Sequence, residues 1–121
     1  MRNKLTLVLG ASTNPERYSN LAIKQLIAKQ HTVVAIGNIQ GLVAGVNIET
    51  TKTDYTNINT VTIYLNPTLQ QQYYDYLISL KPQRIIFNPG TENPKLQALA
   101  AAAGINCINA CTLVMLSTGQ Y

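Results

Sequence analysis

The 121-residue sequence is poor in the residue types that build metal sites, disulfide frameworks and acid–base centres. It contains one histidine, two cysteines and five acidic residues. Two cysteines do not make the disulfide framework of a small secreted protein, and no group of His, Cys and Asp has metal-ligand spacing. His31 comes just before a predicted strand, where we expect a residue of a surface turn rather than a base. The sequence therefore indicates no catalytic residue and no metal ligand.

Long apolar runs and clustered charges are also missing. No segment approaches the roughly 20 consecutive apolar residues that a membrane-spanning helix needs. Nine basic residues against five acidic ones give a formal net charge of +4, but the basic residues are scattered and form no run typical of nucleic-acid binding. We therefore expect no nucleic-acid partner, no membrane partner and, by default, a cytoplasmic location. The modest positive excess suits a small anionic ligand and is equally compatible with ordinary solubility.

The pattern of apolar residues indicates a folded α/β domain. Hydrophobic residues make up 46% of the chain, and a chain of this length can bury one core, so residues 1–121 are expected to form a single domain. The predicted strands are residues 4–10, 32–37, 46–48, 60–65, 84–87 and 105–109. Helices are predicted at residues 19–29, 67–80 and 94–103, with a short helical tail after the last strand. Asn66 and Asn93 each precede a proline and are predicted helix caps.

Strands that alternate with helices favour right-handed βαβ crossovers and a parallel sheet covered on both faces. We therefore predict a three-layer, Rossmann-like α/β fold with a mostly parallel sheet of about five or six strands. In such sheets, ligands bind beyond the carboxyl ends of the strands. The loops expected at that edge are rich in small and polar residues: 10–18, 37–41, 65–68, 88–92 and 109–112. Each alone could be an ordinary turn, but together they favour a phosphate-bearing ligand.

The first of these loops departs from the usual dinucleotide fingerprint. After Gly10 it lacks the second and third glycines of G-x-G-x-x-G, and the second strand ends at Asn38 without a carboxylate. A missing carboxylate suits a ribose that carries a phosphate, because it removes a like charge. Arg17 is the candidate cation for that phosphate or for a pyrophosphate. Its alternative role is that of a solvated loop charge paired with Glu16.

Several stretches together resemble a known family. The segment VLGASTNPERYSNLAIKQLIAKQHTVVAIGN, residues 8–38, resembles the opening of small stand-alone CoA-binding domain proteins. The resemblance continues through Leu65-Asn66-Pro67 and Asn88-Pro89-Gly90-Thr91 to Cys111. The chain is also similar to the CoA-binding half of succinyl-CoA synthetase α chains. It departs from the family at the end of the second strand, which reads Gly37-Asn38-Ile39 in place of Val-Asn-Pro.

The resemblance implies a protein that binds CoA or an acyl-CoA at the carboxyl edge of the sheet without catalysis. The residues it assigns to the phosphates are Gly10, Ala11, Ser12, Asn14 and Arg17, and Thr13 lies in the same turn. Those on the adenosine side are Asn38, Leu65, Asn66 and Pro67, and those beside the pantetheine arm are Asn88, Pro89 and Gly90. Cys111 completes the predicted site, because CoA is itself a thiol and a mixed disulfide is chemically reasonable. Both cysteines could equally be small buried apolar residues.

Two other hypotheses stay open. One is a minimal NAD(P)- or nucleotide-binding, oxidoreductase-like protein. The other is an interaction module with a vestigial pocket, favoured by the unusual residues Leu65, Asn66 and Ala110. Tyr73, Tyr74 and Tyr76 cluster on one predicted helix, which is more typical of packing or a dimer surface than of a cofactor site. A homodimer or an unknown protein partner is compatible with each hypothesis.

Overall fold

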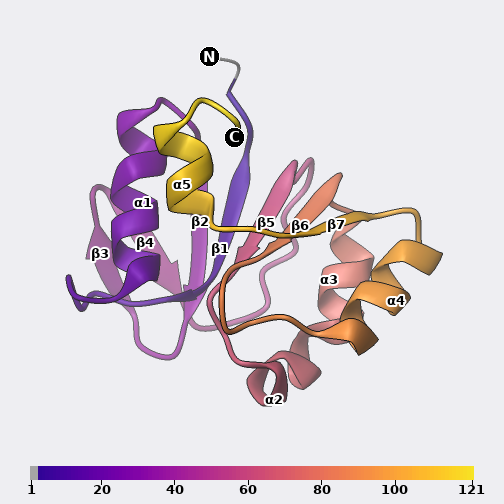
Figure 1. Cartoon of the computed structure of the whole chain (residues 1–121). Helices are drawn as coiled ribbons and strands as arrows, with labels where there is room; N and C mark the ends of the chain where they lie inside the picture. The colour runs from indigo at the N-terminus through magenta and orange to yellow at the C-terminus, as the bar shows by residue number, and fades with distance from the viewer. Residues whose placement is uncertain (1–2) are drawn as a thin grey trace.

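The structure is a computed structural model that describes residues 3–121 (Figure 1). Its strands are β1 Thr6–Ala11, β2 Val33–Gly37, β3 Gly41–Val43, β4 Val46–Glu49, β5 Thr60–Ile63, β6 Arg84–Phe87 and β7 Asn106–Asn109. Its α-helices are α1 Tyr18–Ala28, α2 Pro67–Gln70, α3 Tyr74–Leu80, α4 Pro94–Ala102 and α5 Thr112–Ser117, and η1 Gln71–Tyr73 is a 3₁₀ helix.

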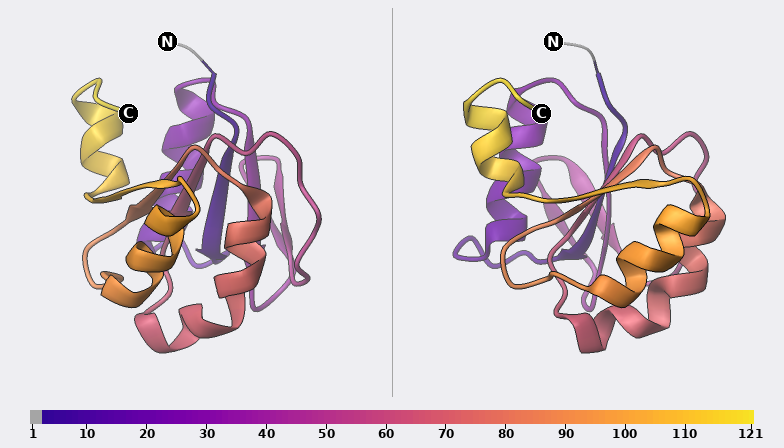
Figure 2. Two further views of the ribbon diagram at one scale, coloured as in Figure 1. Left: turned by 90° about the vertical axis from the view of Figure 1, so that its right-hand side faces the viewer. Right: turned by 45° about the vertical axis from the view of Figure 1, so that its right-hand side comes forward.

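The strands form one sheet in the order β3-β4-β2-β1-β5-β6-β7. Every neighbouring pair is parallel except β3 and β4, which form an antiparallel hairpin. Helices α1 and α5 cover one face of the sheet, and α3 and α4 cover the other (Figures 1 and 2). The predicted α/β, Rossmann-like fold with a mostly parallel sheet is therefore confirmed.

Two hydrophobic clusters lie on the two faces of the sheet. On one face, Leu77 of α3 and Leu96 of α4 pack with Leu7 and Leu9 of β1. On the other face, Ile23 and Leu26 of α1 and Leu116 of α5 pack with Val8 of β1. Consecutive residues of β1 thus serve opposite clusters, as the alternation of side chains along a strand requires.

The sheet has seven strands where five or six were expected. The additional strand is β3, Gly41–Val43, which pairs Gly41 with Ile48 and Val43 with Val46. It was missed because it has only three residues, begins with glycine and exposes Leu42. A strand this short shows no alternation that sequence patterning could detect.

The single helix predicted for residues 67–80 is divided into α2, η1 and α3. Asn66 does cap α2, accepting a hydrogen bond from Leu69 N at 2.9 Å. At the end of α2, Gln70 is fully buried, and its amide nitrogen donates to the carbonyl oxygens of Leu65 and Thr91, each at 2.8 Å. A buried glutamine facing inward interrupts the apolar stripe that a continuous helix would present.

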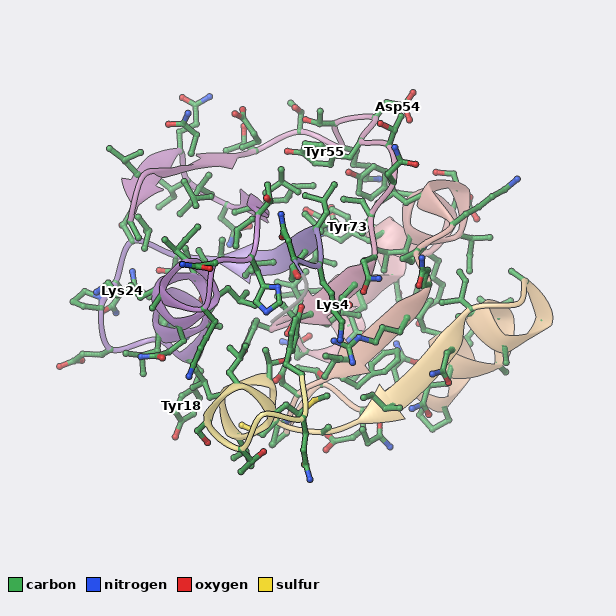
Figure 3. All side chains as sticks on the ribbon, turned by 90° about the horizontal axis from the view of Figure 1, so that it is seen from above. Lys4, Tyr18, Lys24, Asp54, Tyr55 and Tyr73 are labelled. Carbon is green, nitrogen blue, oxygen red and sulfur yellow. The ribbon has the colours of Figure 1, made fainter. Side chains whose placement is uncertain are left out.

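Figure 3 looks onto the amino-terminal edge of the sheet, where Lys4 is labelled. Tyr121 is buried and contacts Lys4 together with residues from other distant parts of the chain. Its hydroxyl lies 2.5 Å from Thr6 Oγ1, and its carbonyl oxygen accepts hydrogen bonds from Lys4 Nζ and from Arg84 Nη2, the latter at 2.9 Å. The His31 ring contacts the Tyr121 ring edge-on, with the two ring centres 4.9 Å apart. We call these residues, Lys4, Thr6, His31, Arg84 and Tyr121, the Tyr121 cluster.

The expectation that His31 is a surface turn residue was wrong. His31 is buried, and its Nδ1 accepts a hydrogen bond from Lys4 N at 2.9 Å. Burial lowers the pKa of His31, and the nearby charges of Lys4 and Arg84 lower it further. The imidazole is therefore held neutral as a structural acceptor.

Candidate ligand-binding site

A cavity of about 650 Å³ lies at the carboxyl edge of the sheet. Its lining comes from the ends of β1, β2 and β5, from the start of α1, from α2 and η1, and from the loop after β6. Strand β1 lies between β2 and β5 in the sheet, so the chain leaves β1 at the point where the strand order reverses. Open α/β sheets bind ligands at this switch point.

A bulge at Gly10 shapes the floor of the cavity. In the pairing of β1 with β2, Leu9 lies opposite Ile36 and Ala11 opposite Gly37, which leaves Gly10 as an extra residue. Gly10 has a φ of +94°, and a Cβ there would lie 3.0 Å from Leu65 Cδ2. The backbone conformation therefore favours glycine, and a Cβ would in addition crowd Leu65.

The ends of β1 and β2 approach each other closely. A Cβ on Gly37 would lie 2.2 Å from Ala11 O, a distance that no side chain can occupy. Glycine at the end of the second strand is thus explained by sterics. This contact brings Ala11 and Asn38 to the same part of the cavity wall.

The turn between β1 and α1 is held by hydrogen bonds within itself. Asn14 N donates to Ser12 Oγ at 3.1 Å, and Glu16 N donates to Asn14 Oδ1 at 3.0 Å. From α1, Asn20 Nδ2 donates to Ser12 O at 3.0 Å. The turn therefore has a defined shape before any ligand binds, and Asn14 contributes to that shape.

The electrostatics of the cavity favour an anion. Arg17 is the only charged residue among the described residues that line it. Arg17 is also the N-cap residue of α1, its side chain makes no capping hydrogen bond, and it is exposed. The first helical residues, Tyr18 and Ser19, also line the cavity, and N–H groups at a helix start lack intrahelical acceptors. A cation and a helix N-terminus thus face one space without a competing carboxylate.

Apolar side chains stand at the mouth of the same cavity. Tyr18 is 71% exposed, Ile39 is 77% exposed and Leu69 is 44% exposed, and all three line it. Tyr64 lies among the lining residues, and burial raises its pKa to about 12, although the hydroxyls of Thr62 and Thr112 act in the opposite direction. A ligand with an anionic part and an apolar part would match this arrangement.

Most of the predicted site residues come together around this cavity. Those that line it are Gly10, Ala11, Ser12, Thr13, Arg17, Asn38, Leu65, Asn66, Pro89 and Gly90. Those that do not are Asn14, Pro67, Asn88 and Cys111. Pro67 is the first residue of α2, where its ring favours the helix start.

Asn88 has a structural position rather than one on the cavity surface. It is buried, and its Nδ2 donates to Thr62 Oγ1 at 2.7 Å and to Ile63 O at 3.0 Å. Its Oδ1 accepts a hydrogen bond from Thr112 N at 2.9 Å. The amide thus joins β5 to the start of α5, and all of its polar atoms are used for this.

The two cysteines are free and half-buried. Cys111 is the N-cap residue of α5 and lies outside the lining of the cavity. Burial raises the pKa of the Cys107 thiol. The geometry of the cavity therefore gives no support to a disulfide between CoA and either thiol.

The cavity also has residues that sequence reasoning did not select. Gly37, Ile39 and Thr91 lie in loops that were expected at this edge, so their place could have been inferred. Leu69 reaches the cavity from α2, and Gln72 and Tyr73 reach it from η1, where the predicted helix is broken. Tyr73 packs against the core as expected and lines the cavity as well. The remaining unselected lining residues are Tyr18, Ser19, Ile36 and Tyr64.

Residues 3–121 offer neither a metal site of several side chains nor a membrane-spanning helix. They contain no group of three or more His, Cys, Asp or Glu side chains placed to hold a metal ion. None of the helices in this part of the chain has the length and apolar character that crossing a membrane requires.

Fold and cavity together define a Rossmann-like domain with a candidate ligand site at the carboxyl edge of its sheet. The family model of the CoA binding domain matches residues 4–117. Because this match covers nearly the whole chain, the protein belongs to the CoA binding domain family.

Solved structures share this fold. A crystal structure of an uncharacterized protein is 41% identical, covers 100% of both chains and has a TM-score of 0.97. A hypothetical protein from Pyrococcus horikoshii OT3 is 24% identical over 97% of this chain and 84% of that one, with a TM-score of 0.87. The cell-free ID.343 structure from Thermus thermophilus is 18% identical over 98% and 91% of the two chains, with a TM-score of 0.86. The last two show likeness of fold alone. No curated protein matches the sequence.

Proposed function

We propose that this protein binds CoA or an acyl-CoA at the carboxyl edge of the sheet and catalyses no reaction on it. Membership of the CoA binding domain family supports the ligand class. The observation that carries the proposal is the charge of the cavity, where Arg17 stands beside the start of α1 and no lining residue is acidic. Such a space attracts phosphate groups and repels none.

In this proposal the ligand runs across the switch point of the sheet. The pyrophosphate lies over the Gly10 bulge and the turn at Ser12 and Thr13, with Arg17 as its cation. The adenosine lies between Asn38 and the segment Leu65–Asn66, and the pantetheine arm passes Pro89 and Gly90. The exposed apolar side chains of Ile39 and Leu69 supply contact area for an adenine ring.

The lining argues against catalysis by the protein itself. Among the described residues around the cavity there is no His, Cys, Asp or Glu. Among the tyrosines that line the cavity, Tyr64 has its pKa raised to about 12 and stays protonated near neutral pH. General acid–base catalysis needs a group that titrates near the working pH. The proposed role is therefore to carry, sense or present the cofactor.

Isothermal titration calorimetry with CoA, acetyl-CoA and NAD tests the proposal. We expect saturable binding of CoA, and we expect Arg17→Ala to weaken it about five- to tenfold, because a charge-assisted contact with phosphate is lost. Lys24→Ala is the matched control, since Lys24 is an exposed cation of the same helix outside the cavity. It should leave the affinity unchanged.

Other outcomes lead to the other hypotheses. Binding of NAD without binding of CoA would favour the oxidoreductase-like protein. Absence of any binding at millimolar ligand would favour the interaction module with a vestigial pocket. In that case Arg17→Ala would change nothing that calorimetry measures.

A further inference from the structure

Lys52 brings a positive charge next to two residues that line the cavity, although Lys52 itself is not part of the lining. It lies in the loop between β4 and β5, and its Nζ donates to Gln72 O at 2.5 Å. The ammonium group also stands 5.4 Å from the centre of the Tyr73 ring. Both Gln72 and Tyr73 belong to η1 and line the cavity. Sequence reasoning assigned no role to Lys52.

The sheet places this lysine next to the end of the second strand. Strands β2 and β4 are parallel neighbours, with Ile36 opposite Glu49. The chain therefore leaves both strands at the same edge, towards Asn38 from β2 and towards Lys52 from β4. In Rossmann-type sites the ribose of the nucleotide lies at the end of the second strand. Lys52 is thus close to the position where the proposed adenosine carries its ribose.

The contacts of Lys52 hold its charge in place and still leave it available. An ammonium group has three N–H donors, and the Gln72 carbonyl takes one of them. The Tyr73 ring adds a cation–π contact, which holds the group beside η1. Because the position is set beforehand, less side-chain entropy is lost when an anion binds.

We propose that Lys52 recognises the phosphate monoester on the ribose, which in CoA is the 3′-phosphate. This inference rests on the proposed function. Arg17, at the start of α1, binds the pyrophosphate, and Lys52, beside η1, binds the phosphate monoester. The two cations come from different elements, Arg17 from the start of α1 and Lys52 from the loop between β4 and β5, so in this proposal each is matched to a different phosphate of the same ligand. The missing carboxylate at Asn38 agrees with a phosphorylated ribose, since an acidic residue there would repel it.

The test compares CoA with dephospho-CoA, which carries a hydroxyl in place of the 3′-phosphate. We expect the wild-type protein to bind CoA about three- to tenfold more tightly than dephospho-CoA, the range of one partly screened ion pair. Lys52→Met keeps the aliphatic stem and should bring the ratio of the affinities for CoA and dephospho-CoA close to one. Lys52→Arg keeps the charge and should retain most of the preference for CoA. Arg17→Ala should weaken both ligands by the same factor and leave the ratio unchanged.

Lys24→Met is the control, because it removes one positive charge from an exposed site outside the cavity. A loss of the ratio in this variant would mean long-range electrostatics and would overturn the role of Lys52. An unchanged ratio in Lys52→Met would overturn it as well, while CoA binding itself would stand. If the wild-type protein bound neither ligand, the proposed function would fail and the inference with it. Thermal melts establish that each variant is folded.

Discussion

The two edges of the sheet use polar residues in opposite ways. At the amino-terminal edge, Arg84 donates to Thr60 Oγ1 at 2.7 Å and to Tyr121 O at 2.9 Å, and its guanidinium lies 4.5 Å from the centre of the Tyr121 ring. At the carboxyl edge, Arg17 is exposed and its side chain makes no capping hydrogen bond. Arginine is therefore part of the packing at the amino-terminal edge, and at the carboxyl edge it faces an open cavity.

The comparison separates stability from binding. The Tyr121 cluster joins the start of β1, the loop before β2, the start of β6 and the last described residue, and its members are buried or half-buried. The cavity edge instead exposes Tyr18 and Ile39 and keeps its turn rigid through local hydrogen bonds. Substitutions at the first edge should therefore change the free energy of unfolding. Those at the second should change affinity.

The largest effect is expected for Tyr121→Ala. It removes a buried ring together with its hydroxyl contact to Thr6 and its contacts to Lys4 and Arg84. Truncation of a buried aromatic side chain costs about 4 kcal/mol. We expect a loss of this size in urea denaturation, with the CoA affinity of the folded protein unchanged within about twofold, the opposite of Arg17→Ala.

Tyr121→Phe is the matched control, since it keeps the ring and loses only the hydroxyl bonded to Thr6. It should cost about 1 kcal/mol. If Tyr121→Ala weakened CoA binding as strongly as Arg17→Ala does, the separation of the two edges would be wrong.

A smaller loss of stability is expected for Asn88→Ala, at the carboxyl edge. The substitution leaves Ile63 O and Thr112 N without their buried partner. Unsatisfied buried groups of this kind cost about 2 to 3 kcal/mol in total. Asn14→Ala is the control, because the Asn14 amide is exposed and bonds only within its own turn, and it should cost less than about 1 kcal/mol.

Asn88 thus sharpens the comparison, because the family resemblance gave it a ligand role. If it acts on the ligand, Asn88→Ala will lower CoA affinity while stability is kept. If it acts as the structure indicates, stability will fall and the affinity of the folded protein will hold. Chemical denaturation and calorimetry on the same preparation distinguish the two.

The smallest effect concerns pH and His31. Because the pKa of His31 is lowered in the folded protein, mainly by burial, the unfolded chain binds a proton more readily. The contribution of neutral His31 to the free energy of unfolding is fully present above the pKa of histidine in the unfolded chain, about 6.5, and is lost as the pH falls below that value. We expect wild-type protein to lose more free energy of unfolding between pH 7.5 and pH 5.5 than His31→Asn does. Equal losses would show that His31 is not the group that titrates.

The fold was largely predictable because it follows from local patterns. Continuous apolar runs such as that of β1 can be told from amphipathic segments such as that of α1 in the sequence. The helix caps Asn66 and Asn93 are where the asparagine-proline pairs predicted them. What failed was short or non-local. Strand β3 exists because β4 offers it a partner, and α2 ends where Gln70 reaches Leu65 and Thr91. His31 is buried by Tyr121, which lies far away in the sequence.

For the candidate site, the sequence by itself determined which edge of the sheet is rich in small residues, and it singled out Arg17 as the cation there. These properties depend on residue types and on the order of strands and helices, both of which can be inferred from periodicity. Only the tertiary structure decided which of those residues line the cavity. Asn88 and Cys111 lie outside the lining, whereas Tyr73 is part of it, and Lys52 contacts the Tyr73 ring. The physical reason is that these side chains are positioned by partners distant in sequence, such as Thr112 for Asn88 and Gln72 for Lys52. Such partners cannot be inferred from a local sequence pattern.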